Sequence, residues 1–120
     1  NIQFIHASLI GKDWDRALLS VDALLLPYGA ERYRYHWAAM LFTAIGFYKP
    51  VLISPEINPE VLEQYFIGEV LNLDSVNSIG QGVQRFVDNL QHNKDKYSQG
   101  LIDANKDYSH YGLIQSIINI

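Results

Sequence analysis

The chain has 120 residues, enough for one domain with a buried core and too few for two. Its formal net charge is −4 and its nine Lys and Arg residues are scattered, which argues against nucleic-acid binding. The absence of cysteine excludes disulfides, thiol catalysis and cysteine-ligated zinc in this chain. No apolar run approaches the roughly 20 residues of a membrane span. We therefore expect a soluble, cytoplasmic protein with no integral membrane segment.

Apolar runs and helical patterns alternate along the chain. This alternation with short loops predicts parallel strand–helix–strand units. The expected fold is α/β and Rossmann-like, with three α/β/α layers and a mostly parallel sheet of about four strands. We expect four strands, at Ile2–Ile5, Asp22–Leu26, Val51–Ser54 and Glu69–Leu73. Helices are expected between them, at Asp13–Val21 with Asp13 as its cap, at His36–Tyr48, and from Asn58 to Phe66. After the last strand we expect a helix that ends near His92, with Val83, Phe86, Val87 and Leu90 on its core face, and then one or two helices in Asp95–Ile120.

The expected ligand site lies at the carboxyl ends of the strands, where ligands bind on parallel sheets. This edge would hold Pro27–Trp37, which leads into a helix start, and Ser54–Asn58. Helix N-termini attract phosphate through unpaired N–H groups, and arginine pairs with phosphate through two hydrogen bonds. The alternative is a solvated loop whose aromatic side chains pack on their neighbours.

The order of motifs along the chain bears on this choice. S-V-D-A-L-L-L-P-Y at Ser20–Tyr28 is followed by W-A-A-M-L-F-T-A-I-G-F-Y-K-P-V-L-I-S at Trp37–Ser54, then by Pro55-Glu56 and Gly68-Glu69-Val70. This succession resembles the C-terminal domain of GT-B glycosyltransferases of the group 1-like type. The resemblance extends from about Ile2 to Tyr111. It implies that residues 1–120 form a single, partial C-terminal Rossmann-like domain, an incomplete GT-B half without the preceding acceptor domain.

The resemblance also implies a function. The complete protein would be a hexosyltransferase-type enzyme that transfers a sugar from a nucleotide-diphosphate sugar to a carbohydrate or other acceptor, and the fragment alone would be inactive. No tightly bound cofactor is implied, although the donor diphosphate can bring a divalent cation. The four histidines lack the spacing of a metal site, and no catalytic residue is identified. The donor-binding residues would be Tyr28, Glu31, Arg32, Tyr35, His36, Trp37, Ala38, Ala39 and Thr43.

One departure from the family keeps a second reading open. The family holds two glutamates near the donor, and alignment on Lys49-Pro50-Val51 places them at Tyr35 and Thr43. Their loss favours a non-catalytic α/β binding or assembly module. A flavodoxin-like or receiver-like domain is a third reading, without the acid cluster that a receiver needs. Apolar surface left by missing elements predicts a homo-oligomer, and the complete protein could lie peripheral to a membrane.

Two further residues carry expectations of their own. Glu56 either meets the sugar or base of a donor, or favours the dipole of the helix that follows it. Lys49 lies at the entry of its strand, on the edge away from the site, and is expected to be structural.

Overall fold

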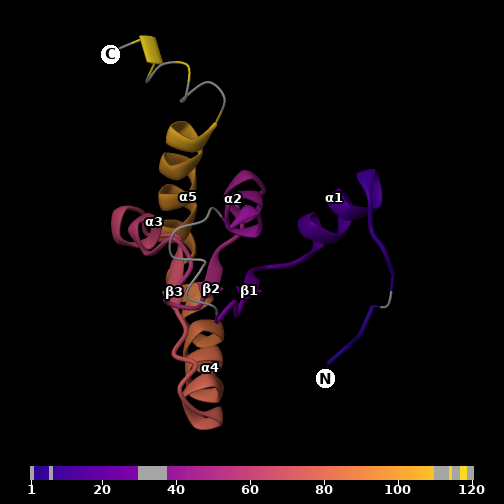
Figure 1. The fold of residues 1–120 in the computed structure, drawn as a ribbon, viewed down its shortest axis with the longest axis vertical. Coiled ribbons are helices and arrows are strands. Elements are labelled where there is room, and N and C mark those ends of the chain that lie inside the picture. Colours follow the sequence, from indigo (N-terminus) through magenta and orange to yellow (C-terminus); the bar gives the residue numbers. More distant parts are fainter. Residues whose placement is uncertain (1, 6, 30–37, 110–113, 115–116, 119–120) are drawn as a thin grey trace.

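The computed structural model describes residues 2–5, 7–29, 38–109, 114 and 117–118. In this part of the chain, three strands form one parallel sheet in the order β1 (Leu24–Leu26), β2 (Val51–Ile53) and β3 (Gly68–Val70). The described residues also form five helices, shown in Figure 1: α1 (Gly11–Ser20), α2 (Ala39–Gly46), α3 (Pro59–Gln64), α4 (Val76–His92) and α5 (Lys94–Tyr108). The predicted α/β fold with a parallel sheet is confirmed.

The first predicted strand is wrong. Residues 2–5 form no strand, so the described sheet has three strands rather than about four. Ile2, Phe4 and Ile5 are 83%, 75% and 68% exposed, and Figure 1 shows this segment away from the sheet. An apolar, β-prone run becomes a strand only where a neighbour completes its hydrogen bonds. No described strand lies beside this segment.

Local details of α1 and α4 also differ from the prediction. Asp13 is not the cap of α1, because this helix begins at Gly11 and Asp13 lies in its first turn. There the Oδ1 atom of Asp13 lies 3.7 Å from the Nη1 atom of Arg16. The N-terminal cap of α4 is Ser75, which forms a reciprocal capping box with Ser78. Val87 was placed in the core face of α4, but it is 55% exposed.

The sheet separates two apolar clusters. β2 is buried at all three residues, and its side chains alternate between the two sides. Val51 and Ile53 join a cluster with α2, α3 and the second half of α5. Leu52 joins a cluster with Phe86 of α4 and Tyr97 from the first turn of α5. Helix α5 therefore contributes to both clusters.

Helix α5 crosses the sheet near the amino ends of its strands. Gly100 packs directly on the backbone of Phe66, so closely that a Cβ atom there would overlap the carbonyl. The Asn105 amide donates a hydrogen bond to the carbonyl of Ile45 at the end of α2, and the Tyr65 hydroxyl donates one to Asp107. These contacts hold α5 near the amino ends of the strands. The carboxyl ends of the strands therefore lie with the loops that follow them and not with α5.

No helix in the described part of the chain is both long enough and apolar enough to cross a membrane.

Candidate functional site

Two polar side chains fasten the described ends of the segment that joins β1 to α2. The Ser54 hydroxyl donates a hydrogen bond of 2.5 Å to the carbonyl of Tyr28, just after β1. The Asn58 carbonyl oxygen, Oδ1, accepts a buried hydrogen bond of 3.0 Å from the N–H of Ala38, the residue before α2. Both side chains come from residues 54–58, between β2 and α3. We call Ser54 and Asn58 the loop anchors.

The loop anchors occupy positions that suit their residue types. The Ser54 N–H extends the ladder beyond β2 by donating to the Leu26 carbonyl at 3.1 Å, which places its small, fully buried side chain next to β1. Asn58 has a left-handed backbone, with φ 32° and ψ 61°, which asparagine adopts more readily than most residues. Pro59 follows at the first helical position, where no N–H is needed. Local sequence thus places both anchors at the carboxyl edge of the sheet.

The start of α2 offers a ligand fewer backbone N–H groups than the N-terminus of an uncapped helix. The Ala38 N–H is used by Asn58, and the Leu41 N–H donates to the Ala38 carbonyl at 3.0 Å. The N–H groups of Ala39 and Met40 have no acceptor within the helix, because first-turn donors precede the hydrogen-bond ladder. These two donors are the backbone contribution that α2 can make to an anion.

Thr43 lies one turn into α2, on the same side as Ala39. Its hydroxyl donates to the Ala39 carbonyl at 3.0 Å. That bond uses the hydroxyl proton, so Thr43 can offer a ligand only oxygen lone pairs. The side chain can accept a hydrogen bond from a ligand, but it brings no charge.

The structure brings four of the predicted donor-binding residues to one place. Tyr28 is half-buried after β1, Ala38 and Ala39 form the start of α2, and Thr43 follows on that helix. The other predicted residues lie outside the described part of the chain: Glu31, Arg32, Tyr35, His36 and Trp37. Sequence reasoning missed the anchoring roles. The available signals were a serine directly after a strand and an asparagine before a helix proline.

Glu56 lies between the two loop anchors and is half-buried. Its Oε2 atom is shielded from solvent and has no hydrogen-bond partner among the described residues. No side chain caps α3, so Glu56 does not serve that helix by a direct capping bond. An acidic side chain is thus held at the carboxyl edge of the sheet with one acceptor unused.

A small apolar hollow of about 200 Å³ adjoins this segment. It lies between the carboxyl ends of β2 and β3, and α3 forms its far wall. Its lining includes Pro55, Ile57, Pro59, Leu62 and Val70. A hollow of this size and character suits a flat or aliphatic group rather than a whole nucleotide.

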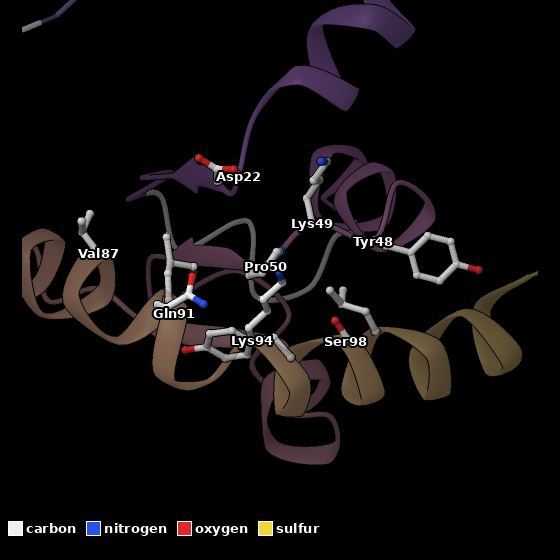
Figure 2. A pocket seen from close by; sticks show the side chains of 11 residues that line it. Asp22, Tyr48, Lys49, Pro50, Val87, Gln91, Lys94 and Ser98 are labelled. Carbon is white, nitrogen blue, oxygen red and sulfur yellow. The ribbon is translucent and has the colours of Figure 1, made fainter.

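A larger hollow of about 500 Å³ lies at the opposite edge of the sheet (Figure 2). Asp22 precedes β1, and Lys49 and Pro50 precede β2, so these residues mark the amino ends of the strands. The end of α4 and the start of α5 form the other wall, with Gln91 and Lys94. Lys49 is tethered, because its ammonium donates to the Leu19 carbonyl at 3.3 Å, as expected for a structural residue.

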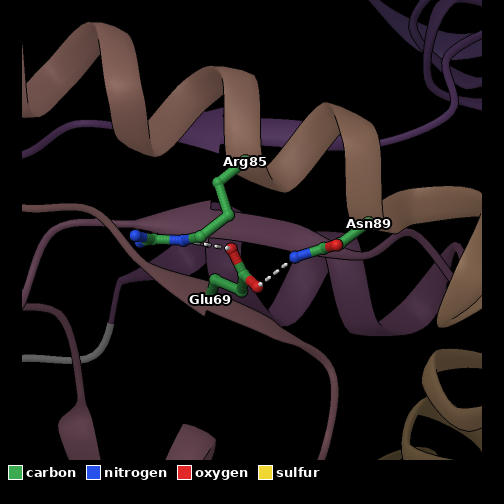
Figure 3. Close-up of polar contacts among 3 residues, drawn as sticks. All are labelled: Glu69, Arg85 and Asn89. Atoms are coloured by element: carbon green, nitrogen blue, oxygen red, sulfur yellow. Dashed lines mark hydrogen bonds and ion pairs between the residues drawn. The ribbon is translucent and has the colours of Figure 1, made fainter.

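A polar group also lies on the α4 side of β3 (Figure 3). Glu69 faces Arg85, with 3.7 Å between Oε2 and Nε, and Asn89, with 3.5 Å between Oε1 and Nδ2. Tyr97 is nearly fully buried, and its pKa is raised chiefly by burial and further by the charge of Glu69, while Asn93 acts in the opposite direction. These contacts join α4 and α5 to β3, which makes the group structural.

The described residues contain no group of three or more His, Asp or Glu side chains that could hold a metal ion. Comparison with known proteins finds no family model, no curated protein and no solved structure that matches this chain.

Proposed function

We propose that this chain is the donor-binding half of a GT-B-type glycosyltransferase, which holds a nucleotide-diphosphate sugar at the carboxyl edge of its sheet. The observation that carries the proposal is the pair of loop anchors. Ser54 and Asn58 fix both described ends of the β1–α2 segment to the end of β2. Fixing the two ends of a connection in advance lowers the entropic cost of ordering that remains to be met when a ligand binds.

The sequence of that segment suits the proposed ligand. It contains Arg32 and Arg34 for phosphate and several aromatic residues for a base or sugar. The N–H groups of Ala39 and Met40, which have no acceptor within α2, would add backbone donors to the diphosphate. The complete domain would then be a three-layer Rossmann-like half, and the acceptor would come from another domain.

Isothermal titration calorimetry with UDP, GDP and their sugars tests the proposal. We expect at least one of these ligands to bind, and Asn58→Ala to weaken that binding because one end of the segment is released. Asn77→Ala is the matched control, since Asn77 is exposed in the first turn of α4. Absence of binding by the wild-type chain to every ligand would contradict the proposal.

A non-catalytic assembly module is the second candidate. It is favoured by apolar side chains left exposed on the sheet and on α4: Leu25 is 51%, Val70 is 47% and Val87 is 55% exposed. Exposed apolar side chains favour association, because association removes them from water. Under this reading the wild-type chain self-associates in light scattering and binds none of the nucleotides. A monomer at high protein concentration would count against it.

A further inference from the structure

We infer that Glu56 is a ligand-binding residue that accepts hydrogen bonds from hydroxyl groups of the donor, and this inference rests on the proposed function. Its first support is the Oε2 atom, which is shielded from solvent and has no hydrogen-bond partner in the part of the chain that the structure describes. Buried polar atoms in proteins are nearly always paired, because an unpaired one loses its hydration without compensation. An exception at a candidate site calls for a ligand that supplies the missing donor.

The second support is position. Glu56 lies two residues after Ser54 and two before Asn58, so it stands between the loop anchors. The same short segment thus fixes the β1–α2 connection and presents a carboxylate at the carboxyl edge of the sheet. A ligand at the start of α2 and a ligand at Glu56 would share this edge.

Charge decides which part of the donor Glu56 can meet. An ionised carboxylate accepts hydrogen bonds but donates none. It repels the diphosphate, which carries charge of the same sign. The uncharged groups that can donate are the hydroxyls of the ribose and of the sugar. A carboxylate with two oxygens suits a pair of neighbouring hydroxyls, which both rings supply.

The alternative role is electrostatic support of α3, whose N-terminus follows Glu56. That helix already carries Glu60 in its first turn. Glu60 is exposed, so its carboxylate can act on the helix dipole without losing hydration. Glu60→Gln is therefore the matched control for Glu56→Gln, because each variant removes one negative charge near the same helix end.

The test combines titration calorimetry and thermal unfolding of wild type, Glu56→Gln and Glu60→Gln. With UDP, GDP, UDP-glucose and GDP-mannose as probes, we expect Glu56→Gln to weaken binding at least about tenfold, as for loss of a hydrogen bond to a charged group. Glu60→Gln should leave affinity unchanged. Weakening of both nucleotide and sugar nucleotide identifies the ribose hydroxyls. Weakening of the sugar nucleotide alone identifies the sugar.

Three different outcomes would overturn the inference. If the wild type binds a probe and Glu56→Gln binds it equally well, the role of Glu56 is wrong and the proposed function stands. If the wild type binds no probe, the proposed function fails and the inference fails with it. Thermal unfolding adds a readout without ligand: we expect Glu56→Gln to unfold at or above the wild-type temperature, because the variant removes a charge from a half-buried side chain whose Oε2 atom is shielded from solvent. A lower unfolding temperature, matching that of Glu60→Gln, would assign Glu56 to α3 instead.

Discussion

Substitution of Asn58 separates two physical contributions at the candidate site. The first is the hydrogen bond from the Ala38 N–H to Oδ1, at 3.0 Å in a buried position. Truncation of Asn58 leaves this N–H without a partner, which costs about 1–3 kcal/mol. The second is the left-handed backbone, with φ 32°, in which a residue with a Cβ atom is disfavoured by about 1–2 kcal/mol and asparagine less so.

The variants Asn58→Gly and Asn58→Ala divide these contributions. Both lose the hydrogen bond, but glycine adopts the left-handed backbone without steric cost. We expect the free energy of unfolding to fall by about 1–3 kcal/mol for glycine and by about 1 kcal/mol more for alanine. Part of the glycine advantage is offset by its greater freedom in the unfolded chain. The total free energy of unfolding of most small domains is about 5–15 kcal/mol, so both changes are large enough to measure.

Urea unfolding followed by circular dichroism measures these differences, provided that the slopes of the transitions agree. The same variants should bind nucleotide more weakly than wild type, because the start of α2 loses its tie to the end of β2. Equal stability of wild type and Asn58→Ala would refute the reasoning. It would mean that the anchoring bond contributes nothing to the folded state.

Three further predictions concern α5, its partners and the free edge of the sheet. In urea unfolding, Gly100→Ala should lower the free energy of unfolding by more than about 2 kcal/mol, because the new Cβ atom overlaps a backbone carbonyl. Gly80→Ala in α4 should raise the free energy of unfolding by about 0.5–1 kcal/mol, because its new Cβ atom meets open space. Burial, and then the hydrogen bond to Asp107, raise the pKa of Tyr65 above its usual value of 10. The stability that this group contributes is therefore complete below pH 10 and is lost at higher pH. We expect Tyr65→Phe to unfold more easily than wild type at pH 7 and to lose less stability than wild type as the pH rises above 10. Leu25→Glu should reduce any self-association in light scattering without loss of helix content in circular dichroism, since Leu25 is about half exposed on β1.

Local pattern was enough to predict the elements that carry the candidate site. Asp22–Leu26, Val51–Ser54 and Glu69–Leu73 were each expected as strands, and the structure has β1, β2 and β3 at nearly these places. Short apolar runs between helical patterns leave little choice, because such runs must be buried and paired. The position of the site at the carboxyl edge follows from the parallel sheet alone.

Side-chain partners distant in the sequence could not be predicted in the same way. An asparagine directly before a helix proline is typical of a helix cap, but the Asn58 side chain accepts a hydrogen bond from Ala38, 20 residues earlier. Both roles use the same side-chain oxygen, and only the approach of α2 selects between them. In the same way, only the approach of β1 gives the Ser54 hydroxyl its acceptor, the carbonyl of Tyr28.

The sequence by itself determined the class of fold, the parallel units and the residues that stand at the carboxyl edge of the sheet, since these follow from hydrophobic spacing and turn residues over short distances. Tertiary structure alone decided that Ile2–Ile5 forms no strand, that α5 crosses beneath the sheet, and that residues 54–58 fasten both described ends of the β1–α2 segment. The physical reason is common to all three. A strand, a buried helix face and a hydrogen bond each need a partner, and which partner arrives depends on how the whole chain folds.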